Sequence, residues 1–285
     1  MCVVGSVNVD QSFTVDVLPR PGQTVLARTV SSASGGKGGN QAVAAARAGA
    51  SVHLVAALGD DHAAAGLRAH LRDNGVALDG MVTVPGPSGA AAIVVDASGE
   101  NTIVVAPGAN AHLTMTSPHV QAVVARADVV LIQLEIPIET ALAAARTARD
   151  AGAVVIVNAS PARAGLDALA GIADVVVANE DEAREWRWPV PHLVITRGAE
   201  GARYVHDGTS VDVSAPAVEP VDTTGAGDVF AGVLAAEWLS GPERALRRAC
   251  AAGALATLIP GAGASAPSAE AIDDVLDATN RVGDP

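Results

Sequence analysis

Residues 129–157 have the sequence VVLIQLEIPIETALAAARTARDAGAVVIV, and this stretch predicts the fold. Its two ends, 129–134 and 154–157, are apolar runs rich in β-branched residues, and residues 139–151 between them are good helix formers. A continuous apolar run is typical of a strand buried on both faces of a sheet. Strand, helix and strand in this order form the crossover unit of a parallel sheet.

The same alternation extends along the chain. Further apolar runs occupy 3–7, 52–58, 175–178 and 193–195, and alanine-rich stretches occupy 40–50, 62–74 and 228–240. We therefore predict an α/β fold with a doubly wound, mostly parallel sheet flanked by helices. No linker divides the chain, so a single domain over residues 1–285 is expected.

Two segments, 11–32 and 81–106, break this rhythm. They lack helix-length patterns and contain proline–glycine turns. We expect them to form a small β-sheet that projects from the domain and acts as a lid over the site. A hairpin without a function is the alternative on pattern alone. The exposed strand edges would also allow a homodimer through the lid.

Composition excludes several partners. The net charge of −13 argues against nucleic acid and against an anionic membrane surface, because both require a basic footprint. No window reaches the roughly 18 apolar residues of a membrane span. The two cysteines, Cys2 and Cys250, lack metal-ligand spacing. Together with an apparent core strand directly after Met1, these features favour a cytoplasmic protein.

Polar residues follow nearly every apolar run. Ligands of open parallel sheets bind outside the carboxyl ends of the strands, so a row of polar residues there predicts a binding rim. Each residue alone would more often be a helix cap. The row consists of Asn8, Asp10, Asp60, Asp61, Glu135, Asn158, Asn179 to Glu182, and Thr196.

The strongest local signal is the segment DTTGAGD at 222–228, which precedes an apolar helical pattern. Its glycines allow the backbone amides of Gly225, Ala226 and Gly227 to surround an anion at a helix N-terminus. Asp228 would then accept the proton of an attacking hydroxyl, as phosphoryl transfer requires. The alternative is a glycine turn with Asp228 as a first-turn acid.

This segment resembles the carboxy-terminal signature of the PfkB family of carbohydrate kinases, and the amino-terminal half is similar to its ribokinase-like branch. The resemblance implies an ATP-dependent kinase that phosphorylates a small sugar. It extends from about residue 3 to about residue 267, through GSVNVD at 5–10, PRPGQTV at 19–25, GGKGGNQAVAAARAGA at 35–50, GDD at 59–61, PGAN at 107–110, QLEIP at 133–137, NEDEA at 179–183 and ITRGAEG at 195–201.

The sugar site follows from the residues and from the resemblance. Asn8 and Asp10 lie two apart at a strand end, so both side chains point the same way and can bind adjacent hydroxyls. The resemblance implies that the same sugar contacts a second set of residues, with Asp228 beside the hydroxyl that is phosphorylated. This set comprises Gly36, Lys37, Gly38, Gly39, Asn40 and Glu135.

The resemblance also implies sites for ATP and for two cations. Asn179 and Glu182 match a motif that organises Mg²⁺ and its waters, with Glu182 acting through water. Asp222, Thr224, the carbonyls near Ile259 and Gly261, and Ser265 resemble a K⁺ site. The expected nucleotide contacts are Asn179, Thr196, Arg197, Gly198, Ala199, Glu200, Gly201, Gly227 and Cys250.

Two features depart from the family pattern. Only 16 residues separate Asn179 from Thr196, where a longer segment is usual, and this could weaken ATP binding or alter oligomer contacts. Cys250 stands where the family often has Asn or His near adenine, which puts purine selectivity in doubt.

The substrate expectation rests on the aromatic content of 2%, because nucleoside sites usually stack the base on aromatic side chains. Only Phe13 lies near the expected sugar site. We therefore expect transfer of the γ-phosphoryl group of MgATP to the primary hydroxyl of a pentose, D-ribose above all. Deoxyribose, fructose, a nucleoside such as adenosine or pseudouridine, and a catalytically silent sugar sensor are the alternatives.

Overall fold

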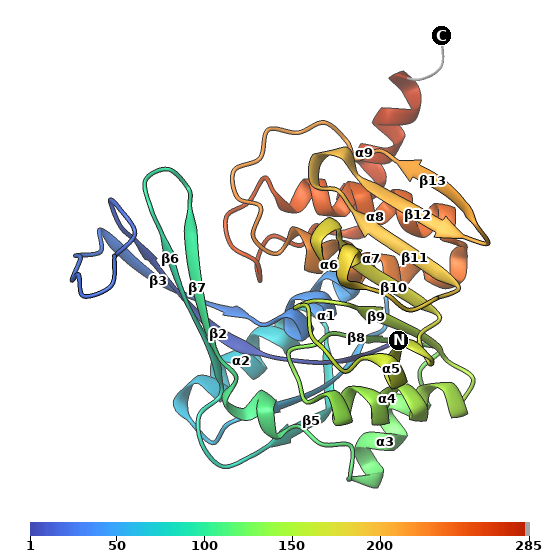
Figure 1. Ribbon diagram of the computed structural model, residues 1–285, viewed down its shortest axis with the longest axis horizontal. Helices are drawn as coiled ribbons and strands as arrows, with labels where there is room; N and C mark the ends of the chain where they lie inside the picture. The colour runs from blue at the N-terminus through green and yellow to red at the C-terminus, as the bar shows by residue number, and fades with distance from the viewer. Residues whose placement is uncertain (283–285) are drawn as a thin grey trace.

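The computed structural model describes residues 1–282, with side chains up to residue 278. Its main body is a sheet with the strand order β13-β12-β11-β10-β9-β8-β1-β4-β5 (Figure 1). The strands from β11 to β5 are parallel, and β12 and β13 add an antiparallel hairpin at one edge. Their bounds are β1 Cys2–Val4, β4 His53–Leu58, β5 Ala77–Thr83, β8 Val129–Ile132, β9 Val154–Asn158, β10 Val175–Asn179, β11 His192–Thr196, β12 Ala202–His206 and β13 Thr209–Val213.

Helices cover both faces of this sheet, as the continuous apolar runs predicted. Val3 points into one core and its neighbours Cys2 and Val4 into the other, so β1 is buried on both sides. The core around Val3 includes α1 Lys37–Arg47, α2 His62–Asp73, α7 Ala226–Glu237, α8 Pro242–Ala256 and α9 Ala269–Val282. The other includes α3 Pro118–Ala125, α4 Ile138–Asp150 and α5 Asp167–Ala170, while α6 Glu180–Glu185 follows β10.

Short 3₁₀ helices complete the described elements. They are η1 Gly108–His112, η2 Gly198–Glu200 and η3 Trp238–Ser240. Among the residues that the structure describes, no helix is long and apolar enough to cross a membrane.

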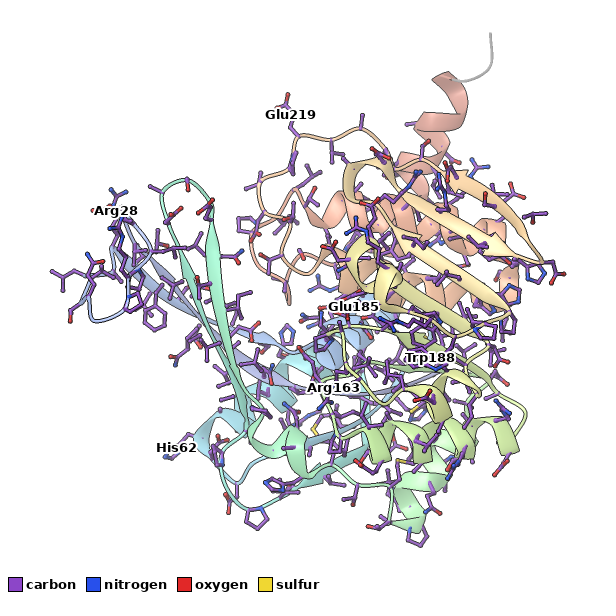
Figure 2. All side chains as sticks on the ribbon, viewed as in Figure 1. Arg28, His62, Arg163, Glu185, Trp188 and Glu219 are labelled. Carbon is purple, nitrogen blue, oxygen red and sulfur yellow. The ribbon has the colours of Figure 1, made fainter. Side chains whose placement is uncertain are left out.

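A second sheet projects from the main body, with the order β3-β2-β6-β7 (Figure 1). Arg28 marks the outer turn between β2 and β3 (Figure 2). The predicted lid ranges need correction at their bounds, because β2 and β3 extend to Asn8 and Gly35, while Met81 to Thr83 belong to β5 and pair with β4. The four strands are β2 Asn8–Thr14, β3 Thr29–Gly35, β6 Gly89–Val95 and β7 Asn101–Ala106.

The strand order reverses at β1. From β1 the chain builds outward through β4 and β5 on one side and later through β8, β9, β10 and β11 on the other. Crossovers that leave in opposite directions open a crevice at the carboxyl ends of the two central strands. The predicted α/β fold is therefore confirmed, and the reversal shows where on the sheet a ligand would bind.

Candidate active site

Two polar strand ends meet at this crevice. Asn8 and Asp10 begin β2, shortly after β1, and Glu135 follows β8. Asn8 is buried and accepts a hydrogen bond from Asn110 Nδ2 at 2.8 Å. Asn110 also exchanges bonds with the backbone of Val7, at 3.0 and 3.2 Å. The amide of Asn8 is thus fixed in position by a second buried amide.

Asp10 lies in a strongly acidic environment. Burial raises the pKa of its carboxyl to about 6, and the charges of Glu135 and Asp228 add to the rise. Its Oδ1 is buried and accepts no hydrogen bond from the described part of the chain. A buried carboxylate oxygen without a donor is costly, and a ligand hydroxyl would supply that donor.

Glu135 is held at the N-terminus of α1. Its Oε2 accepts hydrogen bonds from Ser6 Oγ at 2.5 Å and from the backbone amide of Lys37 at 3.1 Å. Arg163, labelled in Figure 2, donates to the carbonyls of Leu134 and Ile136 on either side of it. Glu135 therefore holds the first backbone amide of α1, whereas α4, the helix that follows it in the chain, has no side-chain cap.

The glycine turn before α1 is required by close packing. Gly36 has a φ of 85°, and a Cβ there would lie 2.8 Å from the backbone of Asn8. A Cβ on Gly38 would lie 2.7 Å from Gly5 and Ser6, and the amide of Gly39 donates to the Ser6 carbonyl at 2.9 Å. The turn therefore presses the start of α1 against the segment that carries Asn8.

Asp228 is the buried carboxylate at the centre of the site. It lies in the first turn of α7, and Asn40 Nδ2 donates to its Oδ2 at 3.1 Å. Gln41 Nε2 donates to its Oδ1 at 3.0 Å. Burial raises its pKa; the charge of Lys37 and these two hydrogen bonds oppose the rise, and Glu135 adds to it.

Lys37 supplies a positive charge among these carboxylates. The carboxylate of Asp228 raises the pKa of Lys37, burial opposes the rise, and Glu135 and Glu182 add to it. The ammonium group therefore remains charged beside Asp228. Lys37 and Asp228 line one cavity of about 140 Å³ together with Asn179, Glu182 and Thr196.

The loop before α7 completes this cavity as an anion site. Gly225 begins the helix in the left-handed region with a φ of 79°, and a Cβ there would lie 2.6 Å from Ala262. A Cβ on Gly227 would meet no atom within 4 Å, so the backbone on this side is open. The amides that begin α7 thus lie at a cavity with Lys37 on its wall, which suits a phosphoryl group.

A second cavity of about 470 Å³ shares Thr196 and Gly227 with the first. The loop between β13 and α7 forms part of its wall, and Glu219 marks the outer turn of that loop (Figure 2). Burial raises the pKa of the Cys250 thiol to about 12, so this wall is neutral. Lining residues include Gly198, Ala199, Gly201, Pro216, Val218, Pro220, Phe230 and Cys250.

Arg197 and Glu200 are the expected nucleotide contacts that line neither cavity. Arg197 forms ion pairs with Glu200 at 3.5 Å and with Asp212 at 3.3 Å. Because Asp212 also pairs with Arg203 across the β12–β13 hairpin, these charges hold the hairpin together.

Asn179 and Glu182 form a capping box at the start of α6. Asn179 Oδ1 accepts from the Glu182 amide at 2.8 Å, and Glu182 Oε2 accepts from the Asn179 amide at 2.9 Å. Both side chains also line the smaller cavity, and the box leaves Glu182 Oε1 outside this exchange. One hard carboxylate oxygen beside a phosphate-sized cavity fits a hydrated Mg²⁺.

The predicted K⁺ ligands come from two loops that meet. Asp222 accepts hydrogen bonds from the amides of Thr224 at 2.9 Å and Gly261 at 2.8 Å. Burial would raise its pKa, but these bonds hold it below its ordinary value. Ser265 is buried and donates to the Ala262 carbonyl. The loop of Asp222 and the loop of Gly261 are therefore joined through an ionised carboxylate, the kind of ligand that a monovalent cation would need here.

Among the described residues, no group of three or more His, Cys, Asp or Glu side chains could hold a metal ion. Asp60 and Asp61, which were placed in the binding rim, instead hold the turn before β6. Asp60 accepts from the Gly86 amide at 2.9 Å, and Asp61 accepts from Ser88 and caps α2. At this strand end the alternative given in the sequence analysis therefore holds, because Asp61 is a helix cap.

Four residues that support the site were not assigned to it individually, although Asn158 had been placed in the polar rim. Ser6, Gln41 and Asn110 hold Glu135, Asp228 and Asn8 in turn, and Asn158 accepts from Gln41 at 3.1 Å. Asn158 and Asn110 were visible in the sequence as a polar strand end and within PGAN. No signal in the sequence distinguished Gln41 from other polar helix residues.

A buried carboxylate between polar side chains and an anion cavity at a helix N-terminus is typical of an enzyme that transfers a phosphoryl group to a hydroxyl. The family model for pfkB family carbohydrate kinases matches residues 1–188 and 189–269. The chain belongs to this family, and it is therefore a phosphotransferase with an alcohol group as acceptor.

Individual relatives narrow the comparison. The chain is 36% identical to the ribokinase of Bacillus subtilis over 97% of its own length and 99% of that protein. It is 30% identical to the ribokinase of Arabidopsis thaliana, solved with ribose and ATP, with a TM-score of 0.87 over 96% and 97% of the two chains. A nucleoside kinase of Burkholderia thailandensis with inosine shares the fold, at 23% identity and a TM-score of 0.84 over 98% and 97%.

Proposed function

We propose that the protein is an ATP-dependent ribokinase, which converts D-ribose to ribose 5-phosphate. The observation that carries the proposal is the position of Asp228. This buried carboxylate is bonded to Asn40, which resembles a sugar-binding residue, and it lines the cavity at the start of α7. A base between a sugar and a phosphate site is what the transfer requires.

In the proposed reaction the primary hydroxyl of ribose attacks the γ-phosphorus of ATP. Asp228 takes the hydroxyl proton as the new O–P bond forms, and the bond from the γ-phosphorus to the β-phosphate oxygen breaks to release ADP. The amides of Gly225 and Gly227 would stabilise the transferring group, and Lys37 supplies positive charge on the same wall. Ala226, which was expected to join them, instead donates its amide hydrogen to the Thr223 carbonyl at 3.3 Å.

Two cations would complete the site. Glu182 and Asn179 would hold a hydrated Mg²⁺, which neutralises phosphate charge when bound. Asp222 and the adjoining loop carbonyls would hold K⁺ under the loop that presents Gly225.

The residues around the sugar position favour a bare pentose. Asn8, Asp10 and Glu135 are polar groups suited to hydroxyls, and Asp10 Oδ1 lacks a hydrogen-bond donor among the described residues. On the lid, Phe13 is the single aromatic side chain, so stacking of a nucleobase has little support. The identities of 30% and 36% to ribokinases point the same way.

The substrate is tested by ADP release with MgATP and K⁺ against ribose, deoxyribose, fructose, adenosine and pseudouridine. We expect ribose to give the highest kcat/KM. Preference for a nucleoside would keep the chemistry and refute our substrate. No turnover with any of them, together with measurable ribose binding, would favour a silent sugar sensor.

The lid would cover the sugar and offers a surface for a homodimer. All residues of the edge strand β7 are exposed, including Ile103 at 50%, Val104 at 65% and Val105 at 45%. Unprotected apolar edges of this kind favour pairing with a second copy. Light scattering should then give a dimer mass that Val104→Lys converts to a monomer mass, whereas a monomeric parent chain would refute the dimer.

A further inference from the structure

Gln41 lies in α1 directly beneath the catalytic carboxylate. It is fully buried, and its Nε2 donates to Asp228 Oδ1 at 3.0 Å and to Asn158 Oδ1 at 3.1 Å. Its Oε1 accepts no hydrogen bond from the described residues. An amide nitrogen has two hydrogens, so both are used on these two acceptors.

The three partners come from three different elements. Gln41 is on α1, Asp228 on α7 and Asn158 at the end of β9. Asn158 is itself tied down, because its Nδ2 donates to the Val177 carbonyl at 3.2 Å. The helices also touch closely here, since a Cβ on Gly232 of α7 would lie 2.4 Å from the Gln41 carbonyl. Gln41 is thus anchored to the sheet on one side of Asp228.

Asn40 and Gln41 hold different oxygens of Asp228. Asn40 donates to Oδ2 and Gln41 donates to Oδ1. The family resemblance implies that Asn40 also contacts the sugar. Its hydrogen bond to Asp228 could therefore be replaced by one to a ribose hydroxyl when ribose binds. Gln41 is fully buried behind the carboxylate and has no such second task.

We propose that Gln41 is a positioning residue, which fixes the orientation of the Asp228 carboxylate and keeps it ionised for proton abstraction. The inference rests on the proposed role of Asp228 as the base. The two hydrogen bonds from Gln41 Nε2 tie the Asp228 carboxylate to Asn158 at the end of β9. In this orientation Oδ2 would face the sugar and Oδ1 would face away from it. An amide that donates to a carboxylate also stabilises the charged form.

Other charges near Asp228 oppose each other. Lys37 on α1 favours the ionised form, whereas Glu135 after β8 disfavours it, and Asp228 in turn affects Asp10 on β2. Burial favours the protonated form most strongly. Loss of the Gln41 bond would therefore move the titration of Asp228 to higher pH.

The test is the pH dependence of kcat in Gln41→Met and Gln41→Glu. Methionine has a similar length but cannot donate, and glutamate places a second carboxylate against Asp228. kcat is preferred to kcat/KM because Asp10 also titrates in the free enzyme. ADP formation is measured at saturating ribose and MgATP, without coupling enzymes.

We expect the acidic limb of the kcat profile to move up by about one pH unit in Gln41→Met and further in Gln41→Glu. Turnover of Gln41→Met should recover at high pH to within a few-fold of the parent value. The Kd for ribose should change less than about threefold, because Gln41 does not face the sugar.

Val43→Ala is the matched control. Val43 is equally buried on α1, but it packs in the core instead of bonding to the site. It should lower the Tm and leave the limb in place. A limb that stays in place in both Gln41 variants, or moves equally in Val43→Ala, would overturn the role of Gln41.

Asp228→Asn separates this failure from failure of the proposed function. If that variant retains turnover, Asp228 is not the base, and the positioning role proposed for Gln41 is refuted as well. If it is inactive and the Gln41 variants keep the parent profile, only the positioning role is refuted.

Discussion

Asp10→Asn should stabilise the free protein at neutral pH while it weakens sugar binding. Asp10 lies within the influence of two other carboxylates, Glu135 and Asp228, and its Oδ1 lacks a donor among the described residues. Ionising it in the folded chain is therefore unfavourable. Asparagine has nearly the same shape and no charge, so it removes this cost.

The magnitude follows from the pKa, which rises from 3.8 to about 6 on folding. A raised pKa means that the folded state binds the proton more tightly, so Asp10 adds stability below about pH 4 and loses it as pH rises through about 6. The raised pKa contributes about 3 kcal/mol to the free energy of unfolding at low pH. About 1.4 kcal/mol of this contribution remains at pH 5 and almost none at pH 8.

The assay is thermal unfolding of both proteins, without ligand, at about pH 5 and about pH 8. The Tm of Asp10→Asn relative to the parent should rise by about 3 °C between the two values, at about 2 °C per kcal/mol for a chain of this size. Ribose affinity should fall at least tenfold. A Tm difference that is the same at both pH values would refute the reasoning.

Further predictions concern the nucleotide side. Gly225 has a φ of 79°, and a Cβ there would lie 2.6 Å from Ala262, so Gly225→Ala should lose more than about 1 kcal/mol of stability as well as turnover. Gly227→Ala has open space at its Cβ, so it should keep its Tm and lose at least tenfold in kcat. Equal losses of Tm in the two variants, measured by a thermal shift assay, would contradict this. Glu182→Gln retains a cap acceptor but no charge, so the Mg²⁺ concentration for half-maximal rate should rise about tenfold in a magnesium titration; an unchanged value would remove Glu182 from the metal site. GTP should replace ATP within about tenfold in kcat/KM, because the larger cavity offers few free side-chain groups that could hydrogen-bond to the base. Cys250 and Thr257 donate to backbone carbonyls, and the rest of the lining is Ala, Gly, Pro, Val, Phe and two Thr residues. A preference for ATP above about a hundredfold would show that backbone groups distinguish the two bases.

The sequence was sufficient for the elements with strong periodicity. Apolar β-branched runs predicted β1, β4, β8, β9, β10 and β11, and alanine-rich stretches predicted helices at α1, α2, α4 and α7. The hairpin of β12 and β13 and the edge strand β5 carry mixed polar and apolar residues, since one side of an edge strand is solvated. This is why Met81 to Thr83 were assigned to the lid.

The residues of the site likewise include some that the sequence predicted and others that it did not. Strand ends and the glycine loop indicated Asn8, Asp10, Glu135 and Asp228, because a parallel sheet brings its carboxyl ends together. Whether a strand-end acid faces a ligand or a neighbouring turn depends on packing across the crevice, which local patterns do not encode. Asp61 bonds to Ser88, 27 residues away, and Gln41 reaches Asp228 over 187 residues.

The most direct test of the account is ADP release with ribose, MgATP and K⁺ by the parent protein and by Asp228→Asn. We predict that the variant loses at least about a hundredfold in kcat and keeps its affinity for ribose within about threefold. Near-normal turnover in the variant would contradict the assignment of Asp228 as the base and, with it, the proposed mechanism.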